Sequence, residues 1–205
     1  MTTILLLTCS PRGDASESNR LALRIVDRLA RAHPQARLVT RALGPLSMPH
    51  VDANYALAQH SATAHVTVDG AIARSEELIR ELETADAVVL ATPLHNLGVP
   101  SALKAWIDHV VRARRTFTMS SAGKVGLLRD RPVYVAVAAG GRFSGADARQ
   151  PDFLTPYLRL ILDTIGLHDV TFFSVEGTGA ADEAVMASRA WAAEQVDAHF
   201  APSWC

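Results

Sequence analysis

The chain of 205 residues predicts an α/β fold built on a doubly wound, five-stranded parallel sheet. Short β-rich runs alternate along the chain with longer amphipathic stretches, as expected of right-handed β-α-β crossovers. Several of the short runs are apolar throughout, as in Val88-Val89-Leu90-Ala91, which suits strands covered by helices on both faces. No internal repeat or linker interrupts the alternation, so we expect a single domain over residues 1–205.

Five strands and five main helices follow from the pattern. The expected strands are Thr3–Cys9, Ala36–Thr40, Ala87–Thr92, Pro132–Ala138 and Asp169–Val175. In the first helix, Ala22, Ile25, Val26 and Leu29 recur at the spacing of one buried face. Another helix follows Pro100, a residue type favoured at the first helical position. The remaining helices are expected over Ile72–Thr84, Asp152–Ile165 and Ala181–Phe200.

Two stretches depart from the simple alternation. Asp52–Thr67 predicts an extra helix and a loop before the Ile72–Thr84 helix. Arg115–Arg131 is longer than the usual connection between elements, and loops of that length are often functional.

Composition excludes several classes of protein. The chain has 20 basic and 21 acidic residues, a balance that gives no electrostatic footprint for nucleic acid or for an acidic membrane surface. No apolar run approaches the roughly 20 residues that cross a bilayer. Two cysteines, Cys9 and Cys205, supply neither a disulfide framework nor a cysteine-based zinc site, and the eight histidines show no metal-binding spacing. We therefore expect a soluble, cytoplasmic protein without a bound metal.

Three loops are the candidates for a ligand site. In an open α/β sheet, ligands bind at the carboxyl ends of the strands, beside the point where the strand order reverses. For the order 2-1-3-4-5, one of the two common ones, that point lies between the first and third strands. The loops to consider therefore follow Cys9, Thr92 and, on the adjacent strand, Ala138.

The first loop has the character of a phosphate site. Hydroxyls at Ser10, Ser16 and Ser18 lie at or near a helix N-terminus, where free N–H groups and the helix dipole favour an anion. Neither G-x-x-x-x-G-K-[ST] nor G-x-G-x-x-G is present, which disfavours a nucleoside triphosphate or a dinucleotide and leaves a monophosphate such as FMN. Asp14 and Glu17 would repel a dianion unless their carboxylates point away. The alternative is that Ser16 and Ser18 only cap the helix.

The second and third loops favour a planar ligand. Pro93 to Pro100 contains two prolines and a glycine, which stiffen the backbone, and Asn96 offers both donors and an acceptor. His95 is the one titratable group of this loop, and it either relays a proton or forms a pocket wall. Gly140-Gly141 allows a ligand close to the backbone, the alternative being an ordinary tight turn.

Other side chains are expected to be structural. Cys9 ends a strand and is interpreted as a buried thiol. Lys104 and Asp108, four residues apart on a helix, are expected to form a surface ion pair. His109 and His168 are interpreted as a helix residue and a turn residue.

The three loops together resemble a known family. Thr92 to Asp108 matches the pattern P-x-x-N-x-x-x-P-x-x-L-K-x-x-[IF]-D of flavodoxin-like NAD(P)H reductases. Arg112 to Phe117 followed by Gly123 to Leu128 resembles the FMN-dependent NADH-azoreductase and quinone reductase family, as do Tyr157 to Gly166 and Glu176-Gly177. The resemblance covers nearly the whole chain and implies a flavodoxin-like sheet of order 2-1-3-4-5.

The resemblance also implies a cofactor, an activity and a set of contacts. The implied protein is a homodimer with one FMN per subunit near the interface, and it passes two electrons from NADH or NADPH to a quinone or azo compound by a ping-pong mechanism. By the same resemblance, the phosphate contacts are Ser10, Ser16, Glu17 (through its backbone) and Ser18. The ring contacts are Leu94, His95, Asn96, Leu97, Ala138, Ala139, Gly140 and Gly141. Phe117 and Met119 are assigned to the substrate pocket, with Phe117 able to serve the neighbouring subunit.

Three departures from the family pattern bear on the acceptor. The family often has M-Y-N-F where this chain has Leu94 to Leu97, and S-R-G-G where it has Ala138 to Gly141. An aromatic residue of the family is Met119 here. Two alternatives remain at this stage: an FMN reductase that releases reduced flavin, and a non-enzymatic electron carrier, although carriers are typically strongly acidic.

Overall fold

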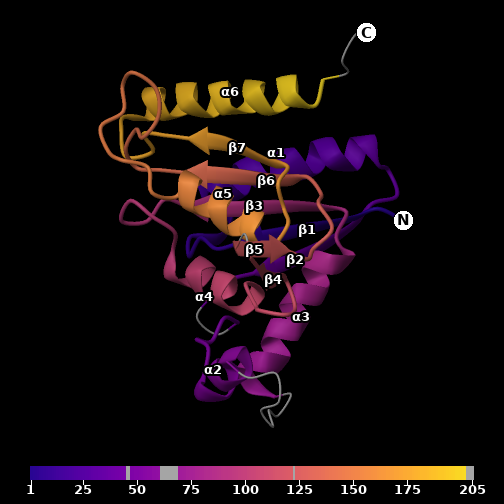
Figure 1. Ribbon diagram of the computed structural model, residues 1–205. Coiled ribbons are helices and arrows are strands. Elements are labelled where there is room, and N and C mark those ends of the chain that lie inside the picture. Colours follow the sequence, from indigo (N-terminus) through magenta and orange to yellow (C-terminus); the bar gives the residue numbers. More distant parts are fainter. Residues whose placement is uncertain (45–46, 61–68, 122, 202–205) are drawn as a thin grey trace.

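The computed structural model describes residues 1–44, 47–60, 69–121 and 123–201 (Figure 1). Its centre is a five-stranded parallel sheet of order β2-β1-β3-β6-β7. The strands are β1 (Thr3–Thr8), β2 (Arg37–Ala42), β3 (Ala87–Pro93), β6 (Val133–Ala138) and β7 (Val170–Val175). In chain order among these five, the arrangement is 2-1-3-4-5, which confirms the predicted topology.

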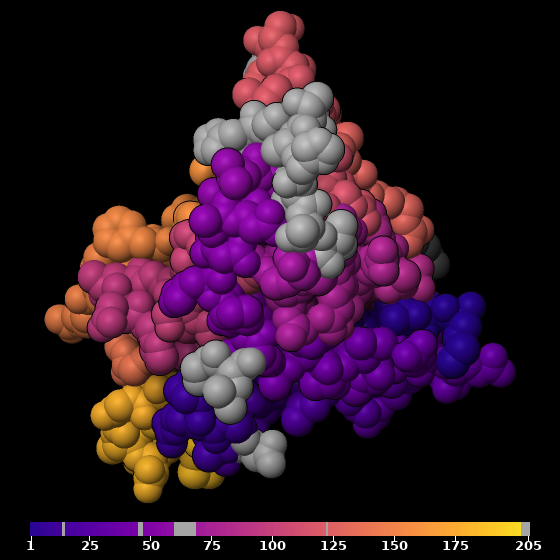
Figure 2. Space-filling view, turned by 90° about the horizontal axis from the view of Figure 1, so that it is seen from below, coloured from indigo at the N-terminus to yellow at the C-terminus, as the bar shows by residue number. Residues whose placement is uncertain are grey.

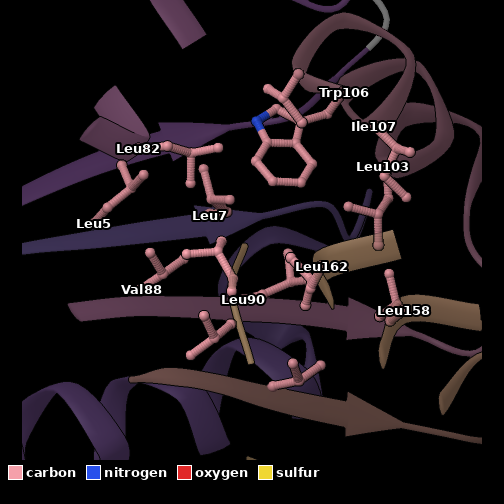
Figure 3. Close-up of a cluster of buried hydrophobic side chains, with 14 of the residues drawn as sticks. Leu5, Leu7, Leu82, Val88, Leu90, Leu103, Trp106, Ile107, Leu158 and Leu162 are labelled. Atoms are coloured by element: carbon pink, nitrogen blue, oxygen red, sulfur yellow. The ribbon is translucent and has the colours of Figure 1, made fainter. Parts of the chain in front are cut away.

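Helices cover both faces of the sheet (Figure 1). On one face lie α1 (Glu17–Ala32) and α6 (Asp182–His199), and on the other α3 (Gly70–Thr84), α4 (Ser101–Val110) and α5 (Thr155–Thr164). The period of two in a strand divides the apolar residues of β1 between these faces. Ile4 and Leu6 pack with α1 and α6, whereas Leu5 and Leu7 pack with the other three helices (Figure 3). This explains why the central strands are apolar throughout.

The helix expected after Pro100 is confirmed and begins at Ser101. Pro100 is its N-cap and not its first helical residue, because its ψ of 151° is extended. Pro156 does lie in the first turn of α5, where a missing N–H costs no intrahelical hydrogen bond.

The long connection after α4 was expected to be a loop and instead holds an antiparallel hairpin. Its strands are β4 (Phe117–Ser120) and β5 (Gly123–Gly126), which form a separate two-stranded sheet. The hairpin projects from the body of the molecule, as the salmon knob at the top of Figure 2 shows. At its base it meets the turn after α5, where Leu128 N donates to Ile165 O at 3.1 Å.

The extra helix before α3 is confirmed as α2 (Ala53–His60), and the loop predicted up to Thr67 lies outside the described residues. Tyr55 fixes this helix to α4, since its hydroxyl donates to the carbonyl of Asp108 at 2.6 Å. None of the helices seen over 1–44, 47–60, 69–121 and 123–201 is long and apolar enough to span a bilayer. Over the same ranges, no three His, Cys, Asp or Glu side chains gather as a metal site would require.

Candidate functional site

The loops after β1, β3 and β6 lie at the same edge of the sheet, where the strand arrows end in Figure 1. Backbone hydrogen bonds join them beyond the strands. Cys9 N donates to Ala91 O at 3.1 Å, and Leu94 N donates to Ala138 O at 2.8 Å. The structure therefore brings together the three loops that the sequence selected.

The start of α1 carries backbone N–H groups that no described residue accepts, as an anion site would require. The first N–H group of α1 that donates a helical hydrogen bond is that of Arg20, which donates to Ser16 O at 3.1 Å. The N–H groups of Glu17, Ser18 and Asn19 have no hydrogen-bond acceptor among the described residues. Beside them the hydroxyls of Ser16 and Ser18 are buried and lie 2.9 Å apart. Ser16 is the N-cap, yet its side chain makes no capping hydrogen bond.

The carboxylate of Glu17 points away from these N–H groups. It pairs with Arg189 of α6 through both oxygens, each at 2.7 Å, and with Arg20 at 3.1 Å. This pairing offsets the repulsion that Glu17 would exert on a bound anion, and it leaves only the Glu17 backbone facing the site. The side chain of Asp14 is outside the described part of the chain. Ser10 lies nearby, and its hydroxyl accepts from Arg12 N at 3.3 Å.

The loop after β3 turns through two residues in the left-handed region. Asn96 has φ 47° and Leu97 has φ 68°, while His95 and Gly98 exchange two backbone hydrogen bonds of 2.9 Å. A left-handed leucine costs roughly 1–2 kcal/mol, and such strain clusters at binding sites. The carbonyl of Leu97 accepts from Phe153 N at 3.2 Å, which helps to hold the turn. His95 and Asn96 are exposed as a result, at the tip of a rigid loop.

The loop after β6 is held from behind by the turn after β7. The carbonyls of Ala139, Gly140 and Gly141 accept, respectively, from the N–H groups of Thr178 (3.0 Å), Gly179 (3.2 Å) and Gly177 (3.3 Å). Within the described residues, the N–H groups of Gly140 and Gly141 donate to no acceptor. The glycine pair thus leaves two unpaired donors at this edge of the sheet, available to a ligand.

Comparison with known proteins agrees with this geometry. A family model described as a flavodoxin-like fold matches residues 2–200. The chain belongs to this flavodoxin-like family. It is 48% identical over 189 residues to an FMN-dependent NADH:quinone oxidoreductase of Pseudomonas fluorescens, covering 92% of this chain and 90% of that one. A protein of the same designation from Burkholderia lata is 47% identical, with 92% of each chain covered.

Solved structures share the fold. An FMN-dependent NADH-azoreductase from Bacillus anthracis, solved in complex with FMN, superposes with a TM-score of 0.82 at 23% identity. The match covers 98% of this chain and all of the other. At that identity the likeness establishes the flavodoxin-like architecture and no more.

A pocket of about 350 Å³ in the flavodoxin-like domain opens beside the first two loops. Its walls include Cys9, Pro11 and His95, which supports a wall role for His95. Its other wall, which no sequence pattern indicated, is formed by the segment after β2, with Met48 and Pro49 among the lining residues. The buried ring of His109 fixes this segment, because its Nε2 lies 2.9 Å from Pro49 O. His109 is thus a helix residue, as predicted, that also shapes the pocket.

Phe117 and Met119 lie apart from the three loops of their own chain. Thr116, next to Phe117, donates to Val110 O at the far end of α4, roughly 13 Å along the helix from Ser101. Phe117 is buried under the Lys124 ammonium, whereas the side chain of Met119 is 67% exposed. A substrate-pocket role for this pair therefore requires a second subunit.

The remaining side chains behave as predicted. Lys104 and Asp108 form an exposed ion pair at 2.6 Å. His168 lies in the short connection between α5 and β7, with its Nδ1 2.6 Å from Asp163. Cys9 is buried, and its thiol donates to Ala91 O at 3.1 Å. Burial raises the pKa of Cys9 to about 12.

Cys9 is accordingly expected to be unreactive in the folded protein. A pKa near 12 leaves about one thiol in 10,000 ionised at pH 8, and only the thiolate attacks a disulfide reagent. In a Cys205→Ser variant, Cys9 should react with an aromatic disulfide only after denaturant is added. Reaction of one thiol per native chain within minutes would contradict the burial described here.

Proposed function

We propose that the chain is an FMN-dependent oxidoreductase that passes two electrons from NADH to quinones. The observation that carries the proposal is the set of unpaired donors at one edge of the sheet. The N–H groups at the start of α1 suit a phosphate, and those of Gly140 and Gly141 suit the heteroatoms of a planar ring. The names of the two relatives with 48% and 47% identity support the same activity.

The proposed contacts divide between the three loops. Ser10, Ser16, Ser18 and the Glu17 backbone would hold the phosphate, beside the positive end of the α1 dipole. The ring would rest on Leu94 to Leu97 and on Ala138 to Gly141. FMN bound there would supply the hydride-accepting chemistry, for which no side chain need act as acid or base. His95 serves as a wall and Asn96 as an exposed hydrogen-bonding group.

We further propose azo compounds as electron acceptors and NADPH as an alternative electron donor. The resemblance of Arg112 to Phe117 and of Gly123 to Leu128 to the azoreductase family supports azo compounds as a second class of acceptor. The two alternatives, a reductase that releases flavin and an electron carrier, differ from the proposal in flavin retention and in NADH consumption. A cytoplasmic location stays a prediction.

The test is the chromophore and its reduction. The purified protein should be yellow, and mass analysis of the denatured supernatant should find FMN. Addition of NADH without oxygen should bleach the flavin absorbance, and a quinone should restore it. FAD in the supernatant, or no binding of added FMN, would refute the proposal, and FMN that NADH leaves oxidised would favour the electron carrier.

Turnover is expected to be ping-pong. A planar ring resting on the three loops has one open face, so the nicotinamide and the acceptor must occupy it in turn. Varying NADH at several fixed quinone concentrations should give parallel double-reciprocal lines. Intersecting lines would indicate a ternary complex and a second substrate site.

We also propose a homodimer. The hairpin β4–β5 and the residue that follows it expose Met119, Val125 and Leu127, which are 67%, 48% and 49% accessible. Such apolar residues on a projecting element often mark a protein contact. Sedimentation at micromolar concentration should show a species of twice the 22.0 kDa chain mass. Replacement of Met119 and Leu127 by serine should shift it towards the monomer, and a monomeric parent would refute the proposal.

A further inference from the structure

The carboxylate of Glu176 lies beside the loop that contains Gly140 and Gly141, and both of its oxygens accept hydrogen bonds. Glu176 follows β7, and its Oε2 accepts from Phe143 N at 2.8 Å and from Ser144 N at 3.1 Å. Its Oε1 contacts the hydroxyls of Ser144 (2.5 Å) and Ser174 (3.0 Å). The Glu176 N–H is held in turn by Ser188 of α6 at 3.0 Å. One side chain therefore connects β7 and α6 to the loop that follows β6.

Both the Glu176 carboxylate and the turn at residues 177–179 form hydrogen bonds with the loop after β6. The turn fixes the carbonyls of residues 139–141, and Glu176 fixes the next N–H groups along, at Phe143 and Ser144. The loop is thereby pinned on both sides of Gly140 and Gly141, whose own N–H groups have no acceptor in the described chain. Donors held in this way lose little conformational entropy when a ligand takes them.

We propose that Glu176 is a positioning residue of the flavin site: it presents the Gly140 and Gly141 N–H groups to the ring and places a negative charge behind them. The inference rests on the proposed function, because it assumes that FMN occupies the three loops. Positioning by Glu176 would also compensate for the alanines that replace polar residues of the family at positions 138 and 139. Ala138 and Ala139 carry no polar side chain, so the ring interactions of this loop depend on its backbone.

The chain offers a matched control at the opposite edge of the sheet. The carboxylate of Asp130 accepts from the N–H groups of Arg131 (2.9 Å), His168 (2.9 Å) and Asp169 (3.3 Å), just before β6 and β7 begin. Glu176 and Asp130 thus hold backbone in the same manner, one beside the proposed site and one far from it. A purely structural role would give both residues the same consequences.

The experiment compares Glu176→Ala, Glu176→Gln and Asp130→Ala with the parent. For each protein, three quantities are measured: the dissociation constant of FMN, the midpoint potential of bound FMN and the melting temperature of the apoprotein. Glu176→Ala should weaken FMN binding on the order of 10- to 100-fold, the usual cost of removing a residue that orients a binding group. Asp130→Ala, which removes the acceptor of three backbone N–H groups, should lower the melting temperature and leave the other two quantities unchanged.

Glu176→Gln separates geometry from charge. Its amide oxygen still accepts from Phe143 and Ser144, and its NH₂ donates to the two serine hydroxyls, which accept as readily as they donate. FMN affinity should therefore stay within a few-fold of the parent value. The midpoint potential should rise, because a negative charge that opposes electron uptake has been removed.

The outcomes are distinct. If the parent binds no FMN, the proposed function fails and the inference fails with it. If the parent binds FMN while the Glu176 variants change only the melting temperature, as Asp130→Ala does, the proposed function stands and the positioning role is overturned. Weaker binding in Glu176→Ala, with rescue of affinity and a raised potential in Glu176→Gln, supports the role.

Discussion

An alanine at position 126 is expected to lower the free energy of unfolding by about 3 kcal/mol or more. A Cβ built on Gly126 would lie 2.2 Å from the Gly166 nitrogen, 2.4 Å from its Cα and 2.5 Å from the carbonyl carbon of Ile165. All three are backbone atoms, so no side-chain rotation relieves the clash. Gly166 is itself at φ 99°, which restricts how the turn after α5 can shift.

Chemical denaturation of the apoprotein measures this change. Gly44→Ala is the control, because a Cβ there meets nothing closer than 3.9 Å and its φ is not in the left-handed region. The control should unfold within about 0.5–1 kcal/mol of the parent, the scale of glycine-to-alanine changes at compatible positions. Equal stability of Gly126→Ala and Gly44→Ala would show that the hairpin does not pack against the α5 turn as described.

The close contact between Gly126 and the turn after α5 also illustrates why the hairpin was not predicted from the sequence. The five parallel strands were predictable because apolar residues at every position, as in Val88 to Ala91, leave few other structures for a buried segment. Strand β5 reads Gly-Lys-Val-Gly and is largely exposed, so it carries no such pattern. Its pairing depends on contacts between distant segments, such as Leu128 with Ile165, and these have no local signal.

The candidate site likewise contains parts that local sequence patterns predict and parts that depend on contacts between distant segments. The loops after β1, β3 and β6 were predictable, because the carboxyl edge of a parallel sheet gathers its loops whatever their sequence. The pocket wall at Met48 and Pro49 was not, since it is held by the ring of His109, which is distant in sequence. Glu176 was noted only as part of a family pattern. Its partner Phe143 lies 33 residues earlier, and only the completed sheet brings them together.

Ser18→Asp is expected to weaken FMN binding by 100-fold or more. Ser18 is fully buried beside the unpaired N–H groups of α1, with its hydroxyl 2.9 Å from that of Ser16. The carboxylate of an aspartate there would accept hydrogen bonds from those N–H groups in place of the phosphate, and its charge would repel a phosphate dianion. Juxtaposed like charges cost several kcal/mol, and each 1.4 kcal/mol is about tenfold in affinity. The fold should persist, because an acidic residue in the first turn of a helix is favourable.

Riboflavin provides the control for this variant, since it carries the same ring as FMN without the phosphate. The parent should bind FMN far more tightly than riboflavin, because the start of α1 contributes only to the phosphorylated ligand. Ser18→Asp should remove most of that preference and leave riboflavin affinity nearly unchanged, with the circular dichroism of the parent retained. Equal losses for both ligands would mean that the substitution disturbs the ring loops. An unchanged FMN affinity would place the phosphate away from α1 and would require a different orientation of the flavin across the three loops.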